Sequence, residues 1–393
     1  MRLLHVIASI RAAGGGPAEA VRSLSAVHLR TGHSVEVASL DDPADHEVSS
    51  FPLPLHALGS ARNTYSFAPA FVPWLRRNRT RFDAVIINGL WQYHSFGAWR
   101  ALRGSTTPYY VFPHGMLDPW FKRTFPLKHL KKSLYWPWAD YRVLRDARAV
   151  LFTCEKEKLL APESFALFRA NSIVTGLGTT PPPPGVESTA FLERYPDLRG
   201  KRLLLFMGRL HPKKGCDLLL EAFAATLAKD PAWRLVFAGP DDSNWQQTLE
   251  ERARALRIAD RTVWTGMLRD KLKWSALAAA EVFALPSHQE NFGIAVAESL
   301  ACGVPVLVSQ EVNIWREIDA TNAGLVAPDT VAGTSELLER WQQLPETERI
   351  AMRRNARQCY EEHFDIEHSA ARLLEAIETT SNHAKGRPIL RNA

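Results

Sequence analysis

The chain has 393 residues, of which 46% are hydrophobic and 23% are charged, a balance that excludes a disordered protein and suits two domains of ordinary size. No apolar run reaches the roughly 18 residues of a membrane-spanning helix, so we expect no transmembrane segment. The formal charge of +6 favours an anionic partner, which could be a phosphorylated substrate, a nucleic acid or a membrane surface.

The N-terminal half predicts a parallel sheet covered by helices, because short apolar runs alternate with helical patterns. The predicted strands are residues 3–10, 34–39, 84–87, 109–112, 150–152 and 172–174. Residues 180–185 contain four consecutive prolines, which neither a helix nor a central strand accepts, and they predict a linker.

After the linker the alternation starts again, which predicts a second doubly wound unit. Its strands are expected at 203–207, 234–238, 263–265, 282–285 and 306–308, and its helices at 217–228, 245–256, 271–280 and 293–301. A last helix is predicted at 366–379 from apolar residues in helical period. We therefore expect an N-terminal Rossmann-like domain over 1–180, a C-terminal one over 181–365, and a segment 366–393 whose helix packs back on the N-terminal domain and whose basic tail is loose.

The four cysteines are widely spaced, without the short separations of a metal or redox site: Cys154, Cys216, Cys302 and Cys359. A reducing cytoplasm fits this usage best. No metal site is predicted.

The most specific motif begins just after the strand predicted at 282–285. Glu290 precedes a predicted helix, and Glu298 follows about two helical turns later. Taken singly, Glu290 is better explained as a helix-start charge and Glu298 as a residue of a solvated helical face. Backbone amides of the first helical turn are donors for an anionic or hydroxyl-rich ligand, and here they belong to Asn291, Phe292, Gly293 and Ile294.

Three further motifs follow predicted strands. Gly208-Arg209 and Lys214-Gly215 follow the strand at 203–207, where guanidinium and ammonium groups suit a diphosphate, although Lys213 reads as a solvated basic turn. The run from Gly14 through Gly15 and Gly16 to Pro17 follows the first strand; alone it indicates only a tight turn. His114 follows the strand at 109–112, where a lone histidine is more often structural than functional.

Together these motifs resemble the retaining glycosyltransferases of family 4, through the E-x7-E pattern, the G-R-x4-K-G pattern and the continuation Ser-Leu-Ala-Cys-Gly-Val-Pro-Val at 299–306. The resemblance implies an α/β protein of GT-B architecture, with two Rossmann-like doubly wound parallel-sheet domains facing a central cleft. Before the linker the chain departs from the family, with Val-Thr-Gly-Leu-Gly at 174–178 where relatives often have Pro-Asn-Gly.

The resemblance also implies roles for individual residues. Glu290 would lie at the donor sugar and Glu298 at the ribose, while Arg209 and Lys214 would bind the pyrophosphate. His114 would contact the donor sugar or the reaction centre. The glycine loop, Gly15 and Gly16, would contact the donor phosphate or the acceptor.

The implied activity is transfer of a hexose from a UDP- or GDP-sugar to a hydroxyl of a glycan or lipid-linked oligosaccharide in bacterial surface-polysaccharide synthesis, without a cofactor or metal. Two alternatives remain open, a sugar-nucleotide 2-epimerase of the same architecture and a donor-binding protein without turnover. A nicotinamide oxidoreductase is a distant third, because its phosphate-binding fingerprint is absent. The oligomeric state is left open.

Residues 120–148 are basic and aromatic. Lys122, Arg123, Lys128, Lys131, Lys132, Arg142, Arg145 and Arg148 face only Asp140 and Asp146, with Trp120, Phe121, Phe125, Tyr135, Trp136, Trp138 and Tyr141 among them. This pattern predicts peripheral binding to an anionic membrane at the inner face of the cytoplasmic membrane. A solvated helical face whose aromatic rings pack inward explains it equally well. No nucleic-acid-binding module accompanies the charge, so nucleic acid is not expected.

Overall fold

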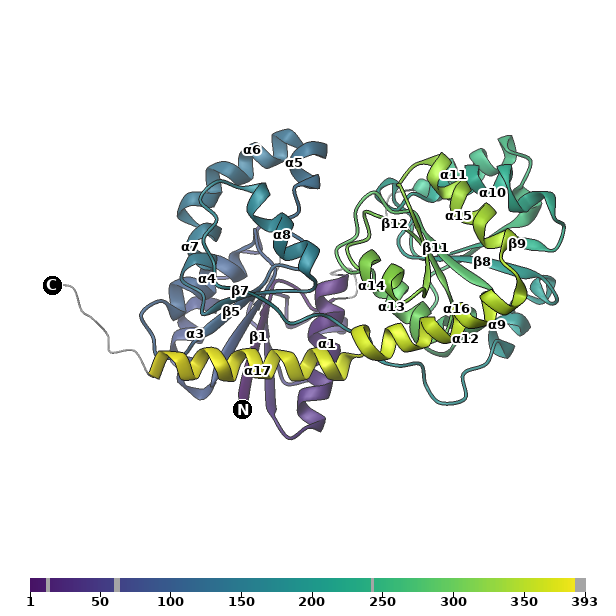
Figure 1. The fold of residues 1–393 in the computed structure, drawn as a ribbon. Coiled ribbons are helices and arrows are strands. Elements are labelled where there is room, and N and C mark those ends of the chain that lie inside the picture. The colour runs from purple at the N-terminus through teal and green to yellow at the C-terminus, as the bar shows by residue number, and fades with distance from the viewer. Residues whose placement is uncertain (12–14, 60–63, 242–243, 386–393) are drawn as a thin grey trace. The chain divides into compact units, whose positions relative to one another are not determined.

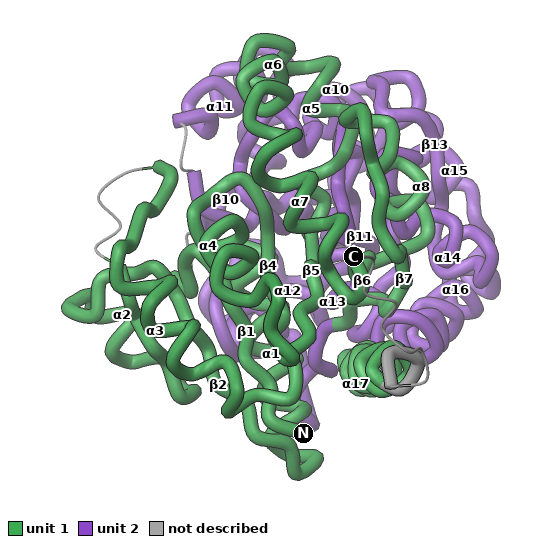
Figure 2. Tube along the Cα trace, turned by 90° about the vertical axis from the view of Figure 1, so that its left-hand side faces the viewer, with its two compact units in different colours: residues 1–178, 366–393 green, residues 179–365 purple. Residues whose placement is uncertain are grey.

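The computed structural model describes residues 1–11, 15–59, 64–241 and 244–385 (Figure 1). Gly14 and the expected loose tail at 386–393 lie outside the described residues. The chain forms two compact units, one of residues 1–178 with 366–393 and one of residues 179–365 (Figure 2). No helix in the described part of the chain combines the length and the apolar character needed to cross a membrane.

The first unit contains a seven-stranded parallel sheet in the order β3-β2-β1-β4-β5-β6-β7. Helices cover both faces of this sheet, so its central strand β4 is buried at every residue. Burial on both faces accounts for the continuous apolar run in the sequence of β4. The strands are β1 Arg2–Ile7, β2 Ser34–Ser39, β3 Leu55–Ala57, β4 Ala84–Asn88, β5 Tyr109–Phe112, β6 Ala149–Phe152 and β7 Ser172–Val174.

The helices of this unit include one from the end of the chain. They are α1 Gly16–Arg30, α2 His46–Ser49, α3 Phe71–Asn78, α4 Tyr93–Leu102, α5 Trp120–Thr124, α6 Pro126–Tyr135, α7 Asp140–Arg145, α8 Glu155–Ser164 and α17 Ile366–Lys385. Helix α17 packs along α1, where His28 Nε2 lies 3.1 Å from the carbonyl oxygen of Ala370. Tyr110 of β5 donates a hydrogen bond of 3.2 Å to the carbonyl oxygen of Ile377. These buried contacts explain why the last helix belongs to the N-terminal unit.

The second unit contains a six-stranded parallel sheet in the order β10-β9-β8-β11-β12-β13. The strands are β8 Arg202–Met207, β9 Trp233–Ala238, β10 Thr262–Gly266, β11 Val282–Leu285, β12 Val306–Ser309 and β13 Gly324–Ala327. The helices are α9 Thr189–Arg194, α10 Cys216–Ala225, α11 Trp245–Ala255, α12 Asp270–Ala279, α13 Ile294–Ala301, α14 Trp315–Ala320, α15 Val331–Gln343 and α16 Glu346–Cys359.

Every predicted strand is present, with shifts of up to three residues at its ends, and β3 and β13 are additional. The helix expected at 217–228 ends at Ala225, because the Thr226 hydroxyl bonds back to the carbonyl oxygen of Ala222 and the backbone leaves the helical region. The predicted last helix continues to Lys385. In each sheet the strand order reverses once, between β1 and β4 and between β8 and β11. Ligands of open α/β sheets bind beyond the carboxyl ends of the strands at such a reversal.

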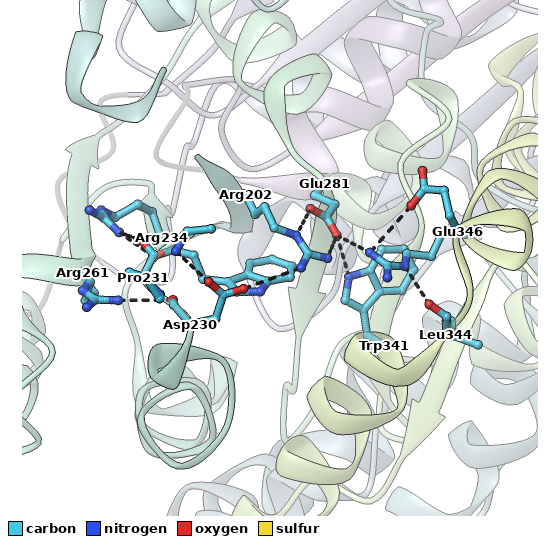
Figure 3. Close-up of polar contacts among 12 residues, drawn as sticks. Arg202, Asp230, Pro231, Arg234, Arg261, Glu281, Trp341, Leu344 and Glu346 are labelled. Carbon is cyan, nitrogen blue, oxygen red and sulfur yellow. Dashed lines mark hydrogen bonds and ion pairs between the residues drawn. The ribbon is translucent and has the colours of Figure 1, made fainter. Parts of the chain in front are cut away.

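A polar network lies at the opposite, amino ends of β8 and β11 (Figure 3). Arg202 holds Glu281 through two hydrogen bonds of 2.7 and 2.6 Å. The indole of Trp341 and the guanidinium of Arg349 also reach Glu281, at 3.2 and 3.4 Å. Because these four residues come from β8, the start of β11, α15 and α16, the network fastens two helices to the sheet away from the predicted ligand edge.

Candidate active site

A cluster of charged residues in the second unit lies where β8 and β11 end, at the reversal of strand order. The ammonium of Lys214 forms an ion pair with the carboxylate of Glu290, and both side chains are less than one-fifth exposed. The backbone of Glu290 is fixed on both sides, since its amide donates to Glu311 and its carbonyl accepts from Asn313, each at 2.9 Å. The loop after β12 therefore holds this glutamate in place.

Gly215 explains how Lys214 reaches Glu290. Its φ is +69°, and a Cβ at this position would lie 2.1 Å from the carbonyl oxygen of Pro286. Only glycine allows the turn Pro212–Lys214 to lie this close to the loop after β11. The carbonyl of Lys213 then accepts hydrogen bonds from the His288 amide and from the hydroxyl of Ser287.

The surroundings of Glu290 keep it ionised. Burial opposes its charge, but the positive charges of Lys214, Lys213 and Arg209 outweigh burial, so the pKa of Glu290 is lowered. Arg209 is exposed beside this pair. A half-buried lysine–glutamate pair next to an exposed guanidinium offers cations to anionic oxygens and a carboxylate to hydroxyl groups.

Glu298 is held by a second lysine that the sequence analysis missed. Lys273 of α12 lies 2.6 Å from Glu298 of α13, and the glutamate side chain is only 9% exposed. Glu298 is therefore not a residue of a solvated helical face. No spacing in the sequence connects Lys273 with Glu298, because the packing of the two helices alone brings them together.

The start of α13 differs from the predicted start by one residue. The helix begins at Ile294, and Gly293 precedes it with a left-handed φ of +77°. In the described parts of the chain, the amides of Phe292, Gly293 and Ile294 form no backbone hydrogen bond. The ring of Phe292 is buried and packs edge-on against Phe364, so only the backbone of Phe292 is available to a ligand.

In the first unit, the predicted residues lie beyond the carboxyl ends of β1 and β5, the two strands that flank β4. Gly15 caps α1 with a φ of +69°, Gly16 is the first residue of that helix, and both are exposed. His114 follows β5 with a φ of +52°, and its ring stacks on Phe112 at 4.6 Å. Burial lowers the pKa of His114 to about 3, so its imidazole is neutral at physiological pH.

Asn88, at the end of β4, determines which nitrogen of His114 carries the proton. The amide nitrogen of Asn88 faces the carbonyl oxygens of Ile86 and Val6, at 3.1 and 3.4 Å, and therefore donates. Its Oδ1 accordingly accepts from Nε2 of His114 at 3.1 Å. The lone pair of His114 is then on Nδ1, which makes this nitrogen an acceptor for a hydroxyl group.

A buried glutamate supports the same turn. Glu157 of α8 accepts hydrogen bonds from the amides of Gly115 and Thr153, at 2.6 and 2.8 Å. The sequence analysis did not single out Asn88 or Glu157. One feature of the sequence could have indicated Asn88, because it is a polar residue at the end of an apolar strand. No feature indicated Glu157, which lies on a helix with several charged residues. The described residues hold no group of three or more His, Cys, Asp or Glu side chains placed to bind a metal ion.

Comparisons with known proteins agree with this architecture. Residues 15–175 match the family described as Glycosyl transferase 4-like domain, and residues 191–359 match Glycosyl transferases group 1. A D-inositol 3-phosphate glycosyltransferase from Geodermatophilus obscurus is 37% identical over 142 residues, which are 32% of this chain and 32% of that protein. The aligned segment thus spans about a third of this curated relative.

Two solved structures share the fold over nearly the whole chain. Sucrose-phosphate synthase from Thermosynechococcus elongatus has a TM-score of 0.75 and 17% identity, covering 98% of this chain and 100% of that one. HepE from Anabaena in complex with UDP-glucose has a TM-score of 0.75 and 16% identity with the same coverage. At these identities the likeness shows the fold, two Rossmann-like parallel-sheet units.

Proposed function

Because the chain belongs to the group 1 glycosyltransferases, we propose that it transfers a hexose from a UDP- or GDP-sugar to an acceptor hydroxyl with retention of anomeric configuration. The observation that carries this proposal is the Lys214–Glu290 pair beside Arg209 at the reversal of strand order. The UDP-glucose complex of HepE, which shares the fold, makes UDP-glucose the first donor to test.

In the proposed donor complex, Arg209 and Lys214 bind the pyrophosphate. The guanidinium takes two oxygens and the ammonium acts as a point charge. As the bond to the sugar breaks, negative charge grows on the departing diphosphate, and the same two cations stabilise it. The amides of Phe292, Gly293 and Ile294, which form no backbone hydrogen bond with the residues that the structure describes, supply donors at the start of α13 for oxygens of the same ligand. Asn291 also contributes to this part of the proposed site.

The two glutamates and the histidine bind hydroxyl groups in this proposal. Glu290 accepts hydrogen bonds from the transferred sugar, and Glu298, held by Lys273, accepts them from the ribose. His114 accepts a sugar hydroxyl through Nδ1. Gly15 and Gly16 contact a donor phosphate or the acceptor at the start of α1 in this proposal, and the space beside Gly15 is open, since a Cβ added there would meet no atom within 4 Å.

For the chemical step, we propose attack by the acceptor hydroxyl on the face from which the phosphate departs. The bond from the acceptor oxygen to the anomeric carbon forms while the bond to the phosphate oxygen breaks. The hydroxyl proton passes to the departing phosphate oxygen, so no side chain has to act as a covalent nucleophile. The residues above bind and orient both substrates, and no cofactor or metal takes part in this proposal.

We further propose that the acceptor is a glycan or a lipid-linked oligosaccharide in bacterial surface-polysaccharide synthesis, at the inner face of the cytoplasmic membrane. The name of the aligned relative, D-inositol 3-phosphate glycosyltransferase, supports a polyhydroxylated acceptor. The exposed apolar surface of α6, described below, supports an acceptor presented at a membrane.

A ligand screen followed by a transfer assay tests the function. A sugar nucleotide that is the true donor should raise the melting temperature more than its rivals do. With that donor and an acceptor panel, the product should keep the anomeric configuration of the donor, as measured by NMR. Conversion of the donor alone into its 2-epimer would support an epimerase instead. Tight donor binding without transfer to any acceptor would support a protein without turnover.

A further inference from the structure

Helix α6 of the first unit, Pro126–Tyr135, turns its apolar side to solvent, whereas an ordinary surface helix packs that side against the protein. Its leucines face solvent: Leu127 is 77%, Leu130 58% and Leu134 71% exposed. The side that meets the rest of the unit carries His129, whose ring stacks on Phe165 at 4.5 Å, and Lys132, whose ammonium lies 4.4 Å from the ring of Trp91. Folding of this unit alone therefore leaves the apolar side of α6 uncovered.

The three leucines follow one another at intervals of three and four residues, so they lie on one side of the helix. Trp138, in the turn after α6, is 49% exposed and donates its indole hydrogen to the carbonyl oxygen of Leu134 at 3.0 Å. We call Leu127, Leu130, Leu134 and Trp138 the leucine face. Of the eleven large hydrophobic side chains that are exposed in the described residues, five lie within residues 125–138, so this apolar exposure is concentrated.

Exposed basic residues lie close to the leucine face in the sequence. Between Asp118 and Asp140 the sequence has five lysines and arginines and no acidic residue. Lys122, Lys128 and Lys131 are exposed. Lys132 differs from them, because its ammonium lies over the rings of Trp91 and Phe121 and burial lowers its pKa to about 8. The exposed lysines are therefore the ones available to an anionic surface.

Of the two roles that the sequence left open for the aromatic residues of this segment, inward packing holds for Trp136 and Tyr135. Trp136 is buried and stacks on Phe165 at 4.6 Å, and Tyr135 bonds to Tyr65 through the two hydroxyls at 2.7 Å. These two rings thus attach the end of α6 to the unit, whereas the outward apolar groups are the three leucines together with Phe125 and Trp138. Asp140, also buried, accepts hydrogen bonds from the Trp91 amide and the Ser95 hydroxyl and fixes the end of the segment.

We propose that the leucine face and the exposed lysines near it dock this unit on the surface of an anionic lipid membrane. Charge complementarity selects this occupant, because lysines near an exposed apolar stripe match phosphate headgroups above acyl chains. A second copy of the chain would bring like charges together at the same place. Figures 1 and 2 show α6 at the opposite end of its unit from α17.

Vesicle co-sedimentation of the full chain tests the proposal. At low salt the protein should bind vesicles containing phosphatidylglycerol and should bind phosphatidylcholine vesicles weakly. The variant Leu127→Asn/Leu130→Asn/Leu134→Asn should bind phosphatidylglycerol vesicles about tenfold or more weakly, since it removes the groups that enter the lipid. The variant Lys122→Gln/Lys128→Gln/Lys131→Gln should weaken binding by about tenfold or more and should reduce its dependence on salt.

The matched control is Leu29→Asn/Leu159→Asn/Ile350→Asn, which removes exposed apolar side chains elsewhere and should bind as the parent chain does. Unchanged melting temperatures would show that all variants fold. Three outcomes would overturn the proposal. The first is that the parent chain does not bind vesicles at low salt, and the second is that the leucine variant binds them as strongly as the parent chain does. The third is that sedimentation velocity finds the parent chain dimeric and the leucine variant monomeric, which would make the leucine face a dimer contact. The measurement uses neither donor nor acceptor, so its failure is distinct from failure of the proposed transfer.

Discussion

Asn88 Oδ1 lies 3.1 Å from Nε2 of His114 and fixes the proton of a neutral imidazole on that nitrogen. Two other histidines also contact Asn88. Nδ1 of His5 lies 3.2 Å from its amide nitrogen, and Nε2 of His94 lies 2.9 Å from its carbonyl oxygen. The end of β4 thus organises three imidazoles, of which His114 is the one at the predicted ligand edge.

The first prediction concerns His114. His114→Asn should lower kcat/KM for sugar transfer by about 10- to 100-fold, the equivalent of one to three kcal/mol for a lost hydrogen bond to substrate. Asparagine tolerates the left-handed φ of +52°, so the turn should persist. The affinity for free nucleotide should not change, because His114 contacts a sugar hydroxyl in this proposal and free nucleotide lacks the transferred sugar. Calorimetry showing an equal loss of nucleotide affinity would assign His114 a different role.

The second prediction concerns pH and stability. Burial lowers the pKa of His5 to about 3 and that of His94 to about 4, whereas unfolded histidine titrates near 6.5. Below pH 6.5 the unfolded chain binds more protons than the folded chain, so stability falls as pH falls. Each histidine contributes a slope of about 1.4 kcal/mol per pH unit down to its folded pKa.

Urea unfolding between pH 7.5 and 5.5 should show this loss. His94→Gln should reduce the slope of the free energy of unfolding against pH by the contribution of one histidine, about 1.4 kcal/mol per pH unit. Stability that is the same across this range would show that these imidazoles are protonated in the folded state without cost.

The third prediction concerns the exposed guanidinium of Arg209. Arg209→Ala should weaken binding of a nucleoside diphosphate by about 1.5–3 kcal/mol, the usual size of a charged hydrogen bond. Arg199→Ala is the matched control, because it removes an exposed arginine before β8, away from the ligand edge. Lys214→Ala is a less direct test, since it also leaves the Glu290 carboxylate without its partner. Equal calorimetric affinities of the Arg209 and Arg199 variants would contradict the proposed pyrophosphate site.

The sequence predicted the two sheets because the signals are local. Apolar runs identified the strands, and Glu290, Arg209 and His114 lie within five residues of a strand's carboxyl end, where a binding site remains a prediction. Lys273, Asn88 and Glu157 were missed because their roles come from partners 25, 26 and 42 residues away. The outward side of α6 was equally unpredictable, since helical periodicity shows that one side is apolar but not which side the unit covers.

The fourth prediction concerns the network at the amino ends of β8 and β11. Glu281→Ala should lower the free energy of unfolding by about 2–4 kcal/mol, because Arg202 and Arg349 lose the carboxylate between them. Glu336→Ala serves as the control, since its ion pair with Arg340 is exposed and should contribute less than about 1 kcal/mol. Nucleotide affinity, measured well below the melting temperature, should be the same in both variants. Equal stabilities of the two variants would show that the network is not a stabilising contact.

The last prediction separates the two glutamates and uses Lys273 to do so. If Glu298 binds the ribose, Glu298→Gln should weaken free nucleotide and sugar nucleotide alike, whereas Glu290→Gln should mainly lower turnover. Lys273→Met should resemble Glu298→Gln, because the lysine fixes the carboxylate at 2.6 Å.

A double-mutant cycle on nucleotide affinity then tests this dependence. The losses in Lys273→Met and Glu298→Gln should combine to less than their sum, with a coupling of about 1 kcal/mol, since the lysine acts through the glutamate. Additive losses would mean that Lys273 contacts the nucleotide directly. Equal effects of Glu290→Gln and Glu298→Gln on free nucleotide would refute the division between sugar and ribose, because a residue that serves only the transferred sugar has no contact with free nucleotide.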